Sequence, residues 1–202
     1  YTDTIPKFHD LNLRKMQFLA AVARASNEKK EVAKEAISFS QEMLAKLSTM
    51  DDTRLPQRVC HNDTKLNNIL FSKKTQKALC LIDLDTLMRG YFHFDFGDAI
   101  RTIVNTAPED EQDHSKITFE KYLFEAFVDG LASNGNLLSK EEIQALPYGV
   151  LLMPLVVMLL MLVIMCPVSR CLIGINNIPE AGRRGSLHQV FMAIQSHYIQ
   201  AC

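Results

Sequence analysis

Hydrophobic residues recur at helical spacing over most of the chain. Two helices are predicted before the middle of the sequence, over residues 8–22 and 32–47, because apolar side chains repeat every three to four positions there. A further helix is predicted over about 115–133, and Ser139–Glu142 has the pattern of a capping box that opens the next one. The sequence therefore predicts a mainly helical protein.

The helical pattern is interrupted by short apolar runs in the middle of the chain. Arg58–Cys60 and Asn68–Phe71 have the length and composition of strands, and the polar residues 72–77 form the turn to a third, Ala78–Ile82. We predict that the last two strands form a hairpin and that the returning strand is buried, with Cys80 in the core. The predicted class is α+β, mainly helical, with a small β hairpin.

The run Gly149–Val168 is long, uncharged and strongly apolar, being rich in Leu, Val, Met and Ile. A stretch of about 20 such residues is long enough to cross a bilayer. We favour a central helix that its neighbours bury, because Pro154 interrupts the run, and the membrane alternative stays open.

The amino-acid composition argues against several classes of function. The chain has 202 residues, enough for a single domain, and its 22 basic and 23 acidic side chains argue against a nucleic-acid partner. The five cysteines lack CxxC spacing, so neither a disulfide framework nor a zinc site is indicated. A reduced, cytoplasmic location is expected.

Candidate chemistry lies in the loop that precedes the hairpin and at the hairpin's end. Asp63 could accept a proton from an acceptor hydroxyl, and Asn68 and Asp83 supply the hard oxygen ligands that Mg²⁺ prefers. Lys65 could direct its ammonium toward a transferred phosphoryl group, and His61 is expected to support the loop by hydrogen-bonding the backbone. The hairpin would bring Asp83 beside Asn68. This spacing predicts phosphoryl transfer from ATP with Mg²⁺.

The triplet Asp95–Gly97 spells the metal-binding DFG of protein kinases, but it lies too far along the chain for that role. Asp83 occupies the expected place, directly after the hairpin. We predict instead that Asp95 or Asp98 is a buried residue that hydrogen-bonds the catalytic loop; the alternative is a helix N-cap.

The motifs HNDTKLNNILF, LIDLDT and DFGDAIRT together resemble the aminoglycoside phosphotransferase and choline kinase superfamily. The residues of these motifs are most similar to those of the sugar-kinase branch typified by N-acetylhexosamine kinase, which phosphorylates an anomeric hydroxyl. The resemblance covers roughly the first half of the chain and implies a protein-kinase-like C-terminal lobe. It also implies that Asp63 is the catalytic base, that Asn68 and Asp83 bind Mg²⁺, and that Asp85 is a second acid near the metal.

No Gly-rich loop or VAIK-like strand precedes the catalytic loop, although kinases of this architecture use both to hold ATP. We therefore expect residues 1–202 to be one catalytic lobe without its N-terminal nucleotide-binding lobe, and the isolated lobe to be nearly inactive. After about Met153 the sequence departs from the family pattern, which leaves the acceptor open: a sugar, or an aminoglycoside, choline or homoserine. A further alternative is a binding module that retains the loop without catalysis.

Overall fold

The computed structural model describes residues 3–48, 54–107 and 116–165. These residues form a mainly helical α+β structure, which confirms the predicted fold class. In chain order the elements are α1 (Leu11–Arg24), α2 (Asn27–Val32), α3 (Lys34–Leu47), β1 (Arg58–Cys60), β2 (Ile69–Phe71), β3 (Ala78–Leu81), β4 (Met88–Gly90), α4 (Phe92–Ile103), α5 (Lys121–Ala132) and α6 (Lys140–Met165), with the single 3₁₀ turns η1 (Leu66–Asn68) and η2 (Leu84–Thr86).

The observed helices follow the predicted ones with shifted ends. Helix α1 begins where the Asp10 carboxylate accepts a hydrogen bond from the Leu13 N–H, 2.9 Å away. The capping box at the start of α6 is present, since the Ser139 and Glu142 side chains each accept a bond from the other's backbone N–H. The helix predicted from about residue 115 lies partly outside the described residues; α5 begins at Lys121.

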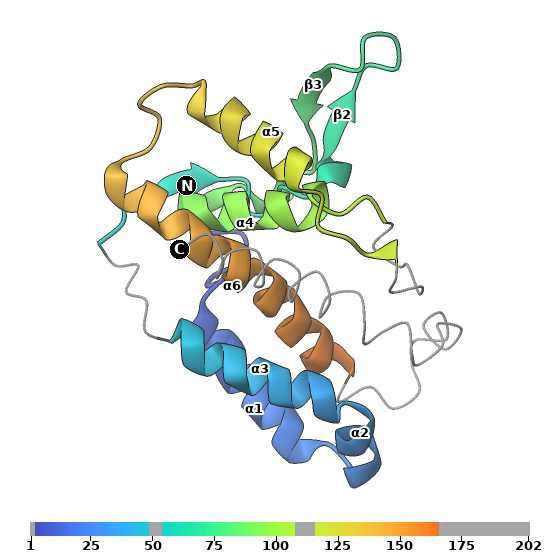
Figure 1. Cartoon of the computed structure of the whole chain (residues 1–202). Coiled ribbons are helices and arrows are strands. Elements are labelled where there is room, and N and C mark those ends of the chain that lie inside the picture. Colours follow the sequence, from blue (N-terminus) through green and yellow to red (C-terminus); the bar gives the residue numbers. More distant parts are fainter. Residues whose placement is uncertain (1–2, 49–53, 108–115, 166–202) are drawn as a thin grey trace.

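Helix α6 is the axis of the structure (Figure 1). Helix α4 crosses its N-terminal half, while α1 and α3 pack along its C-terminal half. One apolar cluster joins α1, α3, α4 and α6, and a second joins α4, α5 and α6. Burial of this kind contributes about 25 cal/mol per Å² of apolar surface removed from water, which makes the two clusters the main source of stability.

The apolar run after Gly149 is helical up to Met165, and residues 166–168 of the predicted segment lie outside the described part. Pro154 lies inside the helix, where the buried apolar surface around it outweighs the loss of one backbone hydrogen bond. Within the described ranges, the span Lys140–Ile164 is long and apolar enough to cross a membrane by length and composition, and half of its most apolar window is buried. Core helices of soluble proteins meet the same criterion.

Two glycines allow α4 and α6 to cross in backbone contact. A Cβ added to Gly97 would lie against the carbonyl oxygen of Gly149, far inside van der Waals distance. A Cβ added to Gly149 would meet the carbonyl oxygen of His93 in the same way. Both positions therefore exclude every side chain, and the separation of the two helices depends on them.

The hairpin β2–β3 differs from the prediction in its burial. Its strands pair in antiparallel register, with Ile69 opposite Leu81, but the returning strand β3 is exposed along its whole length. Leu79 is 66% exposed, and Cys80, expected in the core, is exposed as well. The apolar run was wrongly interpreted as buried because none of the described elements covers this hairpin, which projects from the molecule (Figure 1).

The helix crossing can be tested with one alanine substitution. Gly97→Ala should lower the free energy of unfolding by about 3 kcal/mol, because the methyl group cannot be accommodated without separating α4 from α6. Gly130→Ala in α5 is the matched control, since an added Cβ there meets no atom within 4 Å. It should leave stability unchanged or raise it slightly. Urea unfolding of both variants measures this, and equal stabilities would contradict the proposed constraint.

Two buried histidines lie among the aromatic rings near the start of α4. His93 is 2% exposed, its Nε2 has no hydrogen-bond partner among the described residues, and its ring contacts those of Tyr91, Phe94 and Tyr148. Burial lowers the pKa of His93 to about 4, and burial likewise lowers the pKa of His9 to about 4. Both imidazoles are therefore neutral at pH 7.

These histidines predict that acid destabilises the protein. The unfolded chain binds protons near the ordinary histidine pKa of about 6.5, whereas the folded chain binds them only near 4, so stability falls as the pH drops between these values. His93→Phe should reduce the loss of unfolding free energy between pH 7 and pH 5 by about 2 kcal/mol. Tyr91→Phe is the control, because it keeps the ring cluster without changing a histidine. An identical pH dependence in wild type and His93→Phe would refute the assignment.

Candidate active site

Two short antiparallel ladders hold the ends of the candidate catalytic loop. Strand β1, which leads into the loop, pairs with β4 so that Cys60 lies opposite Met88. At the other end of the loop, the Ile82 N–H donates a hydrogen bond to the Asn68 carbonyl oxygen over 2.9 Å, and this bond extends the β2–β3 pairing. Asp83 follows directly, and it therefore lies beside Asn68 although fifteen positions separate them.

Asp95 in α4 fixes the backbone at the start of the loop. Its carboxylate accepts hydrogen bonds from the His61 N–H at 2.9 Å and the Asn62 N–H at 2.7 Å. Burial raises the pKa of Asp95, and these two backbone hydrogen bonds oppose the rise because they stabilise the ionised form. Thr64 donates its hydroxyl to the Asp95 carbonyl oxygen at 2.6 Å. Asp95 alone therefore holds the loop at three positions, His61, Asn62 and Thr64.

The rest of the loop is supported about two turns farther along α4. The Leu66 N–H donates to the Thr102 hydroxyl over 2.9 Å. Asp98, the other predicted support, forms no bond to the loop backbone; its Oδ1 accepts from Arg101 Nε at 2.7 Å, while its buried Oδ2 has no partner among the described residues. Burial raises the pKa of Asp98, and the charge of Arg101 opposes this. Of the two predicted supports, Asp95 and Asp98, it is Asp95 that hydrogen-bonds the loop backbone.

Asp63 projects from the loop in a fixed position. Its Oδ2 accepts a hydrogen bond from Asn68 Nδ2 at 2.8 Å and lies 3.0 Å from the ammonium of Lys65. The Asn68 amide also donates to the Asp63 carbonyl oxygen at 2.8 Å. The carboxylate remains about a quarter exposed, so a substrate hydroxyl could reach it. A held, partly accessible carboxylate next to a cation is suited to accepting a proton during group transfer.

The candidate metal ligands lie at the base of the hairpin. Because Asn68 uses its Nδ2 for both bonds to Asp63, its Oδ1 is left as an acceptor. Asp83 adopts a left-handed backbone conformation, with φ of 63°, and Asp83 and Asp85 are both exposed. Residues held in this region of φ often belong to functional sites. The oxygen donors fit Mg²⁺, which binds one or two protein carboxylates and completes its shell with phosphate and water.

The described residues contain no group of three or more His, Cys, Asp or Glu side chains in a metal-binding arrangement. A closed site made only of protein ligands is therefore not formed by residues 3–48, 54–107 and 116–165.

His61 and Asn62 join the loop to the strands around it. The buried His61 ring donates through Nε2 to the Ile82 carbonyl oxygen at 2.9 Å, and the Thr86 hydroxyl donates to the His61 carbonyl oxygen at 2.7 Å. The Asn62 amide donates to the carbonyl oxygens of Cys60 and Thr86 at 3.0 and 3.1 Å. His61 was predicted to support the loop in this manner, whereas Asn62 was missed.

Two signals could have pointed to Asn62. Its φ of 62° is left-handed, a conformation that asparagine tolerates better than most residues. Gly90 in β4 gives its side chain room, because a Cβ at Gly90 would lie 2.8 Å from Asn62 Oδ1. An asparagine directly before the candidate base and a glycine that ends a nearby strand are both visible in the sequence.

A contact between residues far apart in the sequence, Arg58 and Glu142, anchors β1 to helix α6. Arg58 donates through Nη2 to Glu142 at 2.8 Å and to the Leu137 carbonyl oxygen at 2.9 Å. The hydrogen bond from Arg58 holds the pKa of the buried Glu142 below its ordinary value. Glu142 is also the acidic member of the α6 capping box. The strand that enters the loop and the first turn of α6 are thereby fixed to each other.

The fold is that of a mainly helical, kinase-like lobe, in which Asp63, Asn68 and Asp83 follow one another in the order of the kinase motif. The model of the phosphotransferase enzyme family matches residues 3–126, which include the whole loop, the hairpin and Asp95. The chain belongs to this family of kinase-like phosphotransferases.

The support given by Asp95 can be tested on the isolated chain. Asp95→Asn should lower the free energy of unfolding by about 2 kcal/mol, because an amide cannot accept both backbone hydrogen bonds. Hydrogen exchange at the amides of His61 and Asn62 should accelerate more than exchange elsewhere. Asp129→Asn on exposed α5 is the control and should change neither quantity. Unchanged exchange at the two amides in Asp95→Asn would contradict the proposed support.

Proposed function

We propose that this protein is an ATP- and Mg²⁺-dependent phosphotransferase that acts on a sugar hydroxyl, with an N-acetylhexosamine as acceptor and its anomeric hydroxyl as the reacting group. The observation that carries the proposal is the placement of Asp63, bonded to Asn68 and Lys65 in a loop that Asp95 fixes. The choice of sugar rests on the resemblance of the motifs HNDTKLNNILF, LIDLDT and DFGDAIRT to the sugar-kinase branch.

In the proposed reaction, Asp63 takes the proton of the acceptor hydroxyl. The acceptor oxygen then bonds to the γ-phosphorus of ATP while the bond from that phosphorus to the ADP oxygen breaks. Lys65, 3.0 Å from Asp63, lies where its ammonium can stabilise the negative charge of the transferred group. Asn68, Asp83 and Asp85 would hold Mg²⁺, whose charge would offset that of the phosphate oxygens.

The exposed hairpin supports the proposed position of the nucleotide. Leu70, Phe71 and Leu81 of its two strands are 45–47% exposed, and a patch of exposed apolar side chains often marks a binding surface. We infer that a bound nucleotide and a nucleotide-binding lobe cover them. The proposed metal ligands Asp83 and Asp85 follow the same hairpin, so the phosphates would lie next to this surface.

The reaction is tested by measuring Mg²⁺-dependent release of ADP from ATP with N-acetylglucosamine, N-acetylgalactosamine, choline, homoserine and an aminoglycoside as acceptors. The complete natural polypeptide that contains these residues should respond to an N-acetylhexosamine. Asp63→Asn should reduce the rate by at least about 10²-fold, and Asp83→Ala should raise the Mg²⁺ requirement or abolish activity. Asn67→Ala, on an exposed residue of the same loop, is the control.

Three outcomes would overturn parts of this proposal. A response confined to choline, homoserine or the aminoglycoside would replace the sugar with that acceptor. Full activity in Asp63→Asn would refute the base assignment. Failure of the polypeptide to bind either Mg²⁺ or ATP, measured by calorimetry, would exclude catalysis and favour a binding module.

A further inference from the structure

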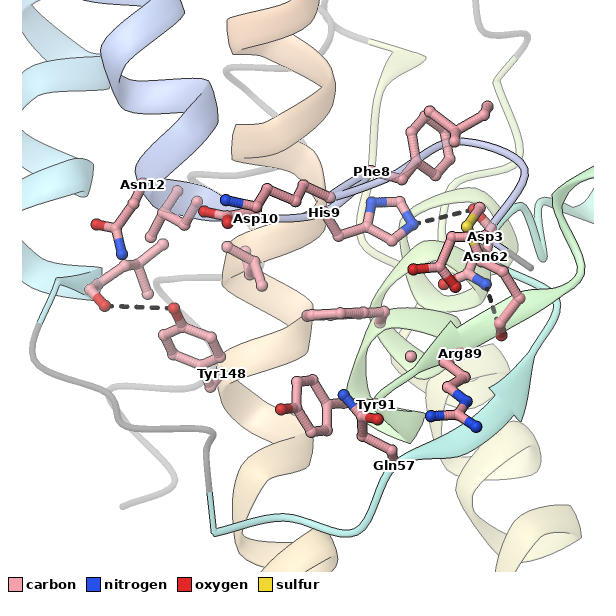
Figure 2. A pocket seen from close by; sticks show the side chains of 18 of the residues that line it. Asp3, Phe8, His9, Asp10, Asn12, Gln57, Asn62, Arg89, Tyr91 and Tyr148 are labelled. Atoms are coloured by element: carbon pink, nitrogen blue, oxygen red, sulfur yellow. Dashed lines mark hydrogen bonds between the residues drawn. The ribbon is translucent and has the colours of Figure 1, made fainter. Parts of the chain in front are cut away.

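A cavity of about 500 Å³ lies behind the catalytic loop, among the segment that precedes α1, the end of α3, the junction of β4 with α4, and α6 (Figure 2). This volume is within the range of small-molecule sites, about 300–1,000 Å³. Asn62 lines the cavity, but Asp63, Asn68 and Asp83 do not. A molecule bound there would contact the back of the loop and would not contact the groups assigned to phosphoryl transfer.

The wall formed by the segment before α1 is preformed. The Arg14 guanidinium donates two hydrogen bonds to the Phe8 carbonyl oxygen, at 2.6 and 3.0 Å. His9, which is nine-tenths buried, bonds through Nε2 to the Asn62 carbonyl oxygen at 3.1 Å. Lys7 has a left-handed backbone, with φ of 58°, which is uncommon for a lysine and points to a constrained turn.

Aromatic rings form the middle of the cavity. Tyr91 and Phe94 pack edge to face with ring centroids 5.6 Å apart, and Tyr148 donates its hydroxyl to the Leu47 carbonyl oxygen. Figure 2 shows Tyr91 near the middle of the cavity and Tyr148 toward the end at which Asn12 lies. Flat apolar faces with hydroxyls at their edges suit a ligand that has both C–H surface and polar groups.

Charges of both signs line the cavity, and they cancel. Lys7 and Arg89 contribute two positive charges, and Asp3 and Asp10 two negative ones. His9 adds none at pH 7, because burial lowers its pKa to about 4. Within the described ranges, neither the Lys7 ammonium nor the Arg89 guanidinium has a hydrogen bond or ion pair, so both are available to a ligand.

Donors and acceptors occur at both ends of the cavity. Asp10 and Asn12 lie toward one end, and Arg89, Gln57 and Asp3 toward the other (Figure 2). An anionic ligand would meet a carboxylate at either end. A cationic ligand would meet Lys7 or Arg89, and an apolar ligand would remove four charges from water without replacing their hydrogen bonds.

We propose that this cavity is a binding site for a neutral monosaccharide, separate from the phosphoryl-transfer site. The hydroxyls of a pyranose both donate and accept, so they match the mixed polar groups at both ends. Its C–H face packs against the aromatic rings in the middle. This inference does not rest on the proposed reaction, because binding can be measured without nucleotide or metal.

The His9 contact gives the site a connection to catalysis. A sugar that packs against His9 touches the residue whose Nε2 holds the Asn62 carbonyl oxygen, one position before the proposed base. Occupancy should therefore slow hydrogen exchange in the Asn62–Asp63 segment, even with no ATP present.

The site is tested by titrating the chain with glucose, galactose and N-acetylglucosamine in saturation-transfer NMR and calorimetry, without Mg²⁺ or nucleotide. At least one sugar should bind saturably. Arg89→Ala and Gln57→Ala should each weaken binding about tenfold or more. Arg24→Ala replaces an exposed arginine outside the cavity and should have no effect, and Asp83→Ala should also leave binding unchanged. Circular dichroism checks that each variant is folded.

Several results would overturn the proposal. One is that none of the three sugars binds, and another is that binding survives both Arg89→Ala and Gln57→Ala. Stronger binding of N-acetylglucosamine 1-phosphate or inorganic phosphate than of the parent sugar would identify an anion site instead. Loss of sugar binding in Asp83→Ala would place the sugar at the transfer site.

Discussion

The backbone contact between α4 and α6 at Gly97 and Gly149 determines where the candidate catalytic loop lies. Asp95, which holds the loop, is two residues from Gly97 on the same helix, and Thr102 lies farther along it. Glu142, which holds β1 through Arg58, is on the partner helix. The two supports of the loop therefore come from opposite sides of one crossing, and any change in helix separation would move them relative to each other.

The loop is held by the half-buried Asp95, one turn before the buried Asp98 on the same helix, and this arrangement has an energetic cost. Burial raises the pKa of both Asp95 and Asp98, which means that their ionised forms are disfavoured relative to water. Asp95 recovers part of that cost through two backbone hydrogen bonds, and Asp98 through Arg101. Preorganised polar groups of this kind hold a reacting residue in place at the expense of overall stability.

Local features of the fold could be predicted from the sequence, and contacts between distant segments could not. The capping box of α6 and the hairpin that brings Asp83 to Asn68 depend on residues close together in the chain. By contrast, the Arg58–Glu142 and His9–Asn62 bonds join residues 84 and 53 positions apart, and no local pattern marks them. A short apolar run also could not distinguish a buried strand from an exposed one, and so the burial of β3 was wrongly predicted.

The catalytic loop separates two surfaces of different character. On one side Asp63, Asp83 and Asp85 are accessible, next to exposed apolar side chains of the hairpin. On the other side Asn62 and His9 connect the loop backbone to a cavity with balanced charge. Because Asn62 and Asp63 are adjacent and share one peptide unit, a change in the Asn62 carbonyl orientation also changes the direction of the Asp63 amide. A contact on the cavity side can therefore influence the side that carries the proposed transfer site through a single peptide plane, with no movement of the surrounding helices.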